Sequence, residues 1–307
     1  MTTSITERGT EMRSYYGRPI LKEPVWTPEI PFYFFTGGLG GASSVLSLVA
    51  RWSGNELLAQ RTIQIASAAD AVSPLLLISD LGRPERFLNM LRVFKVTSPM
   101  SVGSWILSAE GGLIALSAAH EFLGWFPKPL ARAAQAGAAV FGMPLATYTA
   151  ALIANTSVPV WHEGRKELPF AFAGGSAMAA GGMAALLAPD EAGPARRLAI
   201  IGALTEVAAL EYSKATMGKV AEPYKTGAAG KLDKATTVCA LSGAAFHAVA
   251  EVRRSRGLGR LASLITLAGS MLGRWTVFKG GFQSAAAPQY TVEPQRERLS
   301  RQRQRQP

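Results

Sequence analysis

The sequence predicts an all-α integral membrane protein, with eight transmembrane helices arranged as two four-helix bundles in a parallel internal repeat. Three observations lead to this fold class. Of the 307 residues, 48% are hydrophobic and only 17% are charged, whereas an average soluble chain has about 25% charged residues. The charges lie between long uncharged stretches, and an uncharged run of about 18 or more residues is a candidate membrane span. A motif near the N-terminus also occurs a second time, near the middle of the chain.

Eight stretches of the chain are apolar enough to be helices that cross a membrane. They comprise residues 30–50, 62–79, 101–119, 133–154, 168–187, 198–217, 236–252 and 258–278. About 20 residues of α-helix, at about 1.5 Å per residue, cross the roughly 30 Å hydrocarbon core. The second and seventh stretches are short and contain polar residues, so either of them also fits a helix at the membrane surface. Alanine and glycine are frequent in these stretches, which indicates close helix packing.

The first and fifth stretches begin with related motifs. The motif EIPFYFFTGG starts at Glu29, and ELPFAFAGGS starts at Glu167. The stretch that follows each of them carries one acid near its middle, Asp70 in the first half and Glu206 in the second. An even number of spans preserves orientation, so we interpret the pattern as two parallel four-helix repeats. Chance similarity between apolar helices is the alternative. The copies differ at Tyr33, whose counterpart is an alanine.

The predicted spans set the boundaries of the parts of the chain. Residues 1–28 are expected outside the membrane, 29–160 form the first bundle with the candidate site, and 161–280 form the second bundle. Residues 281–307 are expected to be a disordered basic tail near anionic lipid. Eight spans put both termini on one side, where most Lys and Arg residues outside the spans also lie. The positive-inside rule therefore predicts a cell membrane protein with both termini in the cytoplasm.

Acidic residues fall within the predicted spans, among them Asp70, Glu110, Glu206 and Glu211. A charged side chain is costly at the bilayer centre unless it is paired, hydrated or neutral, so such residues are candidates for function. Asp70, Glu110 and Glu206 lie near mid-depth, and we predict that they form a path for protons. The alternative is that these acids are neutral and make hydrogen bonds between helices. Glu211 lies at a similar depth to Arg274 on an antiparallel span, which predicts a buried ion pair.

Metal centres are not expected in this chain. A single cysteine, Cys239, excludes an iron–sulfur cluster or zinc ribbon held by this chain and an intrachain disulfide. Its apolar neighbours predict a buried, unreactive thiol. Three histidines are too few for a cytochrome with two haems. His120 and His247 lie near the outer ends of their spans, which leaves one haem between them as the alternative to our prediction of none.

Polar residues gather where the first and fourth spans meet the cytoplasmic side. Tyr33 lies about 5 Å inside the first span and Tyr148 about 9 Å inside the fourth, while Glu29, Asp80 and His162 border the same face. A tyrosine hydroxyl can donate to a carbonyl, and a nearby acid or histidine can relay a proton. An apolar pocket with a few polar groups suits a quinone ring whose tail lies in lipid.

We therefore predict a quinone site that contains Tyr33, Tyr148, Glu29 and His162. Two of these residues also have structural interpretations. Tyr33 is an aromatic residue at the depth of the membrane interface, where such side chains are common without a function. Glu29 is an acid at the start of a helix, where the helix dipole favours a negative charge.

Three stretches of the sequence resemble the NrfD/PsrC family, the membrane subunits of polysulfide-reductase-type molybdoenzyme complexes. They are YYGRPILKEPVWTPEIPFYFFTGGLGG, DLGRPERFLNMLRVFKVTSPMSVGSWIL and YTAALIANTSVPVWHEGRKELP, and they cover most of the first half, from Tyr15 to Pro169. The resemblance implies eight helices in two bundles and a quinone bound without haem. It also implies that Tyr33 and Tyr148 match positions that contact the quinone headgroup. Some members have histidine at the position of Tyr33.

The resemblance also implies partner proteins. A four-cluster iron–sulfur subunit would dock beside the quinone and exchange electrons with a molybdopterin catalytic subunit. Members of the family often face this partner outward, whereas the basic loops predict an inward docking face here. We predict a membrane anchor subunit that links these partners to menaquinone or ubiquinone, contacts membrane lipid and binds no nucleic acid. The alternative is a proton-coupled secondary transporter, which a repeat with mid-membrane acids also fits. Neighbouring genes for the two partners would favour the first function.

Overall fold

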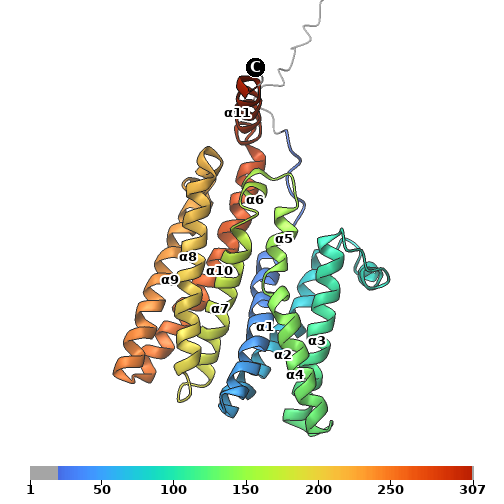
Figure 1. The fold of residues 1–307 in the computed structure, drawn as a ribbon, viewed down its shortest axis with the longest axis vertical. Helices are drawn as coiled ribbons and strands as arrows, with labels where there is room; N and C mark the ends of the chain where they lie inside the picture. Colours follow the sequence, from blue (N-terminus) through green and yellow to red (C-terminus); the bar gives the residue numbers. More distant parts are fainter. Residues whose placement is uncertain (1–19, 306–307) are drawn as a thin grey trace, which may run out of the picture.

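Long helices make up most of the chain in the computed structural model, which describes residues 20–305 and contains no strand within them (Figure 1). The first half contains α1 (Glu29–Trp52), α2 (Glu56–Asp80), the 3₁₀ helix η1 (Pro84–Leu91), α3 (Pro99–Leu123), α4 (Lys128–Leu145), α5 (Tyr148–Ala154) and α6 (Pro159–Glu163). The second half contains α7 (Leu168–Leu187), α8 (Gly193–Thr216), the 3₁₀ helix η2 (Gly218–Tyr224), α9 (Gly227–Arg253), α10 (Arg256–Ala286) and α11 (Gln289–Arg305). The all-helical prediction is therefore confirmed.

Seven helical segments are long and apolar enough to cross a membrane, judged by length and composition within the described residues. They are α1, α2, α3, α4 with α5, α7, α9 and α10. The second and seventh predicted spans, for which a surface helix is the alternative, are among them as α2 and α9. The sixth predicted span forms α8, which is long but does not meet the same measure of hydropathy. The eighth crossing therefore stays a prediction.

The helices pack in two sets whose order repeats. In the first set, α1 packs on α2 and α4, and α3 packs on α4. In the second set, α7 packs on α8 and α10, and α9 packs on α10 and α8. The sets meet mainly through α1 and α7, as Figure 1 shows with α7–α10 on one side and α1–α4 on the other. Each set also has its 3₁₀ helix after its second long helix. This arrangement is compatible with the two predicted four-helix bundles.

Close helix contacts depend on glycine, as the small-residue spacing predicts. A Cβ atom on Gly41 of α1 would overlap the backbone carbonyl of Gly142 on α4, and a Cβ on Gly142 would overlap Gly41 in return. The two backbones therefore touch directly, a distance that a larger residue would not permit. This contact brings the start of α5 close to α1, which matters for the candidate site.

The C-terminal part differs from the prediction of disorder after residue 280. Helix α10 continues to Ala286, and α11 covers Gln289–Arg305. The sequence of α11 is rich in Gln, Arg and Glu, which are good helix formers, and two contacts hold its first turns against η2. Tyr290 donates to Glu222 at 3.2 Å, and Lys219 pairs with Glu293 at 3.2 Å. Residues 306–307 of the predicted tail, and residues 1–19 of the predicted N-terminal segment, lie outside the described residues.

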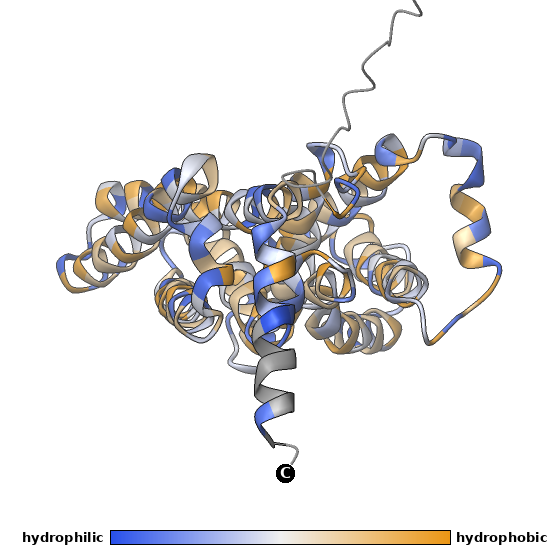
Figure 2. Ribbon diagram, turned by 90° about the horizontal axis from the view of Figure 1, so that it is seen from above, coloured by the Kyte–Doolittle hydropathy of each residue, from blue (hydrophilic) through white to orange (hydrophobic). Residues whose placement is uncertain are grey.

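One segment extends away from the packed helices. The chain between α2 and α3, which contains η1, projects to the side of the first set (Figure 1). Figure 2, seen from above, shows this segment apart from the other helices, with hydrophobic and hydrophilic residues both present on it. Several of its residues contact the packed helices: the Met90 sulfur lies 3.7 Å from the Ser104 hydroxyl on α3, the Phe94 ring lies edge-on to Trp105 of α3, and Phe87 lines a pocket between α2 and α3.

Candidate functional site: a cavity between two tyrosines

A small cavity lies at the end of the first helix set where α1 and α5 begin and α2 ends. Its volume is about 50 Å³, which has room for water but not for an aromatic ring without some movement of the walls. We call it the tyrosine cavity. The residues that line it come from the segment before α1, from α1, α2, α3 and α5, and from the loop with η1; they include Trp26, Tyr33, Phe34, Leu77, Asp80, Met90, Met100, Ser104 and Tyr148.

Tyr33 lies in the second turn of α1 and is fully buried. Its hydroxyl has no hydrogen-bond partner among the described residues. Buried tyrosine hydroxyls usually have a partner, because an unpaired buried polar group costs about 1–3 kcal/mol. The ring of Tyr33 lies edge-on to that of Tyr148, with ring centres 6.5 Å apart. The Tyr33 hydroxyl is therefore available to a water molecule or a ligand in the cavity.

A break in the fourth span places Tyr148. Helix α4 ends at Leu145, just after Pro144, and α5 starts at Tyr148. Proline cannot donate to the carbonyl one turn before it and its ring crowds that carbonyl, so it favours a break. The turn leaves the Ala146 carbonyl outside the helical pattern, and the Ser176 hydroxyl of α7 donates to it at 3.2 Å. The second helix set thus supports the break beside the site.

The ring of Tyr148 occupies space that a glycine provides. A Cβ atom on Gly103 of α3 would overlap this ring. Tyr148 is half-buried, and Gly103 is buried. The ring therefore fits against the α3 backbone, which holds it toward Tyr33.

Asp80 joins the cavity to the entrance of α1. Its Oδ1 atom accepts hydrogen bonds from the Thr27 backbone N–H at 2.9 Å and from the Thr27 hydroxyl at 2.5 Å. This contact ties the last residue of α2 to the segment before α1. It also leaves a carboxylate at the wall of the cavity as a further hydrogen-bond acceptor.

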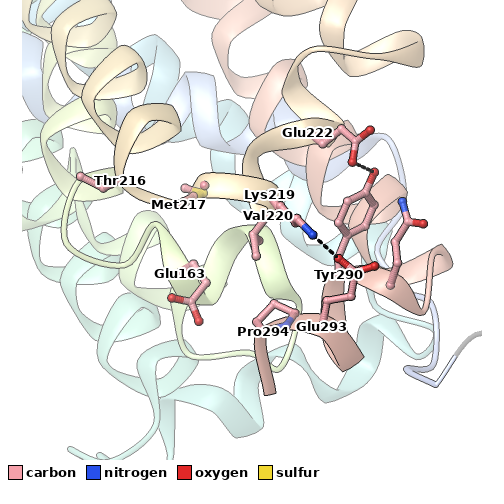
Figure 3. A pocket seen from close by; sticks show the side chains of 11 residues that line it. Glu163, Thr216, Met217, Lys219, Val220, Glu222, Tyr290, Glu293 and Pro294 are labelled. Carbon is pink, nitrogen blue, oxygen red and sulfur yellow. Dashed lines mark hydrogen bonds and ion pairs between the residues drawn. The ribbon is translucent and has the colours of Figure 1, made fainter. Parts of the chain in front are cut away.

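The structure does not bring all four predicted quinone ligands together. Glu29 is the first residue of α1, as predicted, but it is not one of the residues that line the tyrosine cavity. His162 is exposed on α6 and lines a different, shallow pocket next to Tyr290 of α11. A larger polar pocket of about 580 Å³ adjoins it between α6, η2 and α11. Figure 3 shows that polar and charged groups there face one another, with Lys219 directed at Glu293 and the Tyr290 hydroxyl at Glu222.

Some residues of the cavity were not singled out from the sequence. Three of them, Met90, Met100 and Ser104, lie in the second stretch that resembles NrfD/PsrC proteins. That resemblance is the one sequence feature that points to them, because the stretch contains no chemical motif for a ligand site. Methionine and serine in an apolar segment do not indicate a ligand by themselves. Only the fold shows that they face the two tyrosines.

Two of the predicted proton-path acids meet inside the first set. Asp70 on α2 and Glu110 on α3 are buried, and their carboxyl groups lie close enough to interact with each other. The Ser44 hydroxyl of α1 donates to Glu110 Oε1. Two carboxyl groups in contact in an apolar interior are stable only when they share a proton or are neutral, since two adjacent negative charges repel. The pair therefore holds at least one proton.

Polar side chains extend from this pair in both directions. Toward the tyrosine cavity, the Ser73 hydroxyl donates to the Thr36 hydroxyl at 2.8 Å. Toward the opposite end, the Gln135 amide donates to the Ser47 hydroxyl at 3.1 Å, one turn from Ser44. These groups lie on three helices of the first set and provide hydroxyl and amide groups along its interior.

Glu206 lies in the second set, apart from this pair. It is buried beside Gly175 and Gly273 and near the guanidinium of Arg274. Arg274 donates to the Phe172 carbonyl at 2.8 Å and to the Ser176 hydroxyl at 3.0 Å. No hydrogen bond among the described residues joins Glu206 to Asp70 or Glu110.

The predicted ion pair between Glu211 and Arg274 is wrong. Glu211 is largely exposed and pairs with Lys214 at 2.6 Å, while Lys214 also pairs with Asp233 at 2.7 Å. Glu206 and Glu211 both lie on α8. Glu211 is five residues further along the helix and therefore points to a different side. Depth alone therefore did not identify the partner of Arg274.

The histidines and the cysteine have ordinary protein contacts. The His247 ring lies 3.4 Å from the Thr266 hydroxyl, and the His120 ring hydrogen-bonds to the Phe126 carbonyl. Cys239 is half-buried rather than buried as predicted. Within residues 20–305, no group of three or more His, Cys, Asp or Glu side chains is arranged to hold a metal ion.

The fold and the cavity together define a multi-pass helical membrane protein with a partly polar site near one end of its first helix set. The chain belongs to the NrfD family, because the family model described as polysulphide reductase, NrfD matches residues 20–193, more than half of the chain. The match includes every residue of the tyrosine cavity and continues through α7, beyond the Tyr15–Pro169 region of resemblance. No curated protein matches the chain.

Membership of this family has a direct functional meaning. NrfD proteins are membrane anchor subunits of polysulphide reductase-like complexes, and they typically act with molybdoenzyme complexes. The chain is accordingly a membrane anchor subunit of this kind.

Proposed function

We propose that the chain binds a quinone headgroup in the tyrosine cavity and exchanges electrons between an iron–sulfur partner subunit and the membrane quinone pool. The observation that carries this proposal is the meeting of Tyr33 and Tyr148, from helices far apart in the sequence, at one cavity. The unpartnered hydroxyl of Tyr33 supports it further. A quinone supplies reversible two-electron, two-proton chemistry in the membrane.

The residues of the cavity fit a quinone ring chemically. Tyr33 offers an O–H donor to a carbonyl oxygen, and Tyr148 provides a second hydroxyl on the other wall. Phe34 and Leu77 supply apolar walls. The small volume requires the walls to move, and the flexible side chains of Met90 and Met100 are suited to this.

Partners of the chain follow from its family. We propose a four-cluster iron–sulfur subunit as the direct electron partner and a molybdopterin subunit as the catalytic partner. The known association of NrfD proteins with molybdoenzyme complexes supports this. The partner would dock at the end of the bundle nearest the tyrosine cavity, because electron transfer is efficient only over short distances.

Proton movement through the first helix set is the next part of the proposal. The Asp70–Glu110 pair holds a proton between polar groups that extend toward both ends of the set. Glu206 would serve the second set, where Arg274 balances its charge. The same buried acids also support the alternative of a proton-coupled transporter, which needs no partner subunit.

One experiment separates the two functions. The chain is purified in mild detergent from its native membranes with all bound proteins, and electron transfer is measured with a quinol and with a soluble redox dye. We expect co-purification of an iron–sulfur and a molybdopterin protein and quinol-linked activity that needs this chain. A chain that purifies alone and binds no quinone would contradict the proposal and favour the transporter.

A further inference from the structure

A groove opens on the outer side of the first helix set, between α2 and α3 and below η1. Its volume is about 390 Å³, much larger than the tyrosine cavity. We call it the α2–α3 groove. The apolar part of its lining includes Pro74, Phe87, Leu107, Gly111, Gly112 and Ala115.

The groove continues from the tyrosine cavity along three elements. On α2, Leu77 lines the cavity and Pro74, three residues away, lines the groove. On α3, Ser104 lines the cavity and Leu107 the groove. Residues three apart share one face of an α-helix and of a 3₁₀ helix.

The same spacing occurs on η1, where Met90 faces the cavity and Phe87 the groove. All three walls therefore pass from one space to the other within a single turn. The two spaces are thus about one helical turn apart, a distance that a chain attached to a ring in the cavity can cover.

Two glycines keep the groove open without serving helix contact. Among the described residues, a Cβ atom on Gly112 would meet no atom within 4 Å, and one on Gly111 would meet only the Asp70 side chain, at 3.8 Å. By contrast, Gly41 and Gly142 are required for contact between two backbones. Packing between helices thus gives no reason for glycine at position 112, whereas a ligand in the groove does.

The chemistry of the groove fits a hydrocarbon chain. Besides its apolar residues, the lining contains Ser67, Ser108 and Asp70. The Cβ atom of Asp70 faces Gly111, while its carboxyl group reaches across to Gly40 of α1 and to Glu110. Gly112 lies in the middle of α3, so the groove is at the depth of the lipid tails, where water does not compete for it.

We infer that the α2–α3 groove binds the prenyl tail of the quinone whose headgroup occupies the tyrosine cavity. This inference rests on the proposed function and adds a second binding subsite to it, for a linear isoprenoid chain. The tail would leave the cavity past Leu107 and Phe87 and lie over Gly111 and Gly112. The groove would also be the route by which the quinone enters from the bilayer.

The test is Gly112→Leu in the full chain, with Ala245→Leu as the matched control. Gly112 has free space for the added side chain, so the fold should survive, and Ala245 is an exposed small residue on α9, away from the groove. Binding is measured in lipid nanodiscs by quenching of tryptophan fluorescence. The probes are a naphthoquinone and a benzoquinone, each without a tail and with a tail of four isoprene units.

We expect Gly112→Leu to weaken binding of the tailed probe about five-fold or more, because the leucine occupies the path of the tail. Binding of the tailless probe should be unchanged, and Ala245→Leu should change neither. Ala115→Leu, at the far end of the groove, is the second variant if Gly112→Leu does not yield folded protein.

Two results would overturn the inference while leaving the proposed function intact. Equal weakening of both probes would mean that Gly112 supports the headgroup site or the fold. Unchanged binding of the tailed probe would mean that the groove holds only bilayer lipid. If the unmodified chain bound neither tailless nor tailed quinone, the proposed function itself would be wrong, and the inference would fall with it.

Discussion

The two tyrosine hydroxyls are the chemical centre of the proposed quinone site, and each can be removed with little change in volume. We predict that Tyr148→Phe and Tyr33→Phe each lower quinol-linked turnover of the assembled complex several-fold. A lost hydrogen bond to a ligand costs about 0.5–1.5 kcal/mol, or roughly two- to ten-fold. Steady-state assays with a quinol check this prediction.

Two controls make the tyrosine experiment specific. Activity of the complex with a soluble dye should be unchanged, because the dye bypasses this subunit. Ala171→Ser, at the buried repeat-equivalent of Tyr33, should not change quinone affinity. Full quinol-linked activity in both tyrosine variants would show that the headgroup binds elsewhere.

A substitution at Asp70 should affect proton transfer rather than quinone binding, because Asp70 contacts Glu110 and points away from the tyrosine cavity. Asp70→Asn keeps the size of the side chain but cannot release a proton. We expect nearly unchanged quinone affinity and slower quinol-linked turnover. The measurement is KM and kcat for the quinol in the same preparation; a raised KM with normal kcat would argue against a role in proton transfer.

Contacts between helices determine whether the tyrosines reach the cavity at all. The break between α4 and α5 turns Tyr148 toward α3, and the Ser176 hydroxyl of α7 satisfies the carbonyl that the break exposes. The second helix set thus contributes to the site although it does not line it. The site therefore also depends on the contact between α3 and α5, in which the Tyr148 ring lies against Gly103.

We predict that Gly103→Ala destabilises this contact. The added methyl group would overlap the Tyr148 ring, and overpacking of a well-packed interior typically costs about 1–3 kcal/mol. Thermal unfolding in detergent should show a lower midpoint, and quinone affinity should fall because the Tyr148 ring moves. Gly257→Ala, at an exposed position of α10 with open space around it, is the control and should lower neither the unfolding midpoint nor quinone affinity. Equal behaviour of the two variants would mean that Tyr148 does not need its present position.

Reporter fusions can test which end of the helices faces the cytoplasm. Basic residues outside the helices favour the end that carries α11 and the loop with η1, so we predict that this end is cytoplasmic. A reporter fused after Ala287, which follows α10, should report the cytoplasm. A reporter inserted at Pro127, between α3 and α4, should report the exterior. The opposite pattern would mean that the basic loops meet an acidic partner outside the membrane.

Much of the architecture could be predicted from the sequence because crossing a membrane imposes a strong local constraint. Each span needs a continuous apolar stretch of about 20 residues, and that property is readable without knowledge of neighbours. This is why helices formed at all eight predicted positions, and why Glu29 is the first residue of α1. The same locality explains the partial success at α8, where Arg196 and Glu206 are buried by neighbouring helices that hydropathy does not record.

The tertiary structure decided which side chains meet. Hydropathy and spacing give the depth of a residue in the membrane but not the direction in which its side chain points or the helix that it faces. For that reason Arg274 faces Glu206 and not Glu211, and His162 lies away from Tyr33 although both are at the same end. The break that positions Tyr148, the glycine that receives its ring and the groove below η1 all depend on contacts between distant helices. Such contacts are set by packing in three dimensions, so the sequence alone determined the class of protein and the fold, and the packing determined the site.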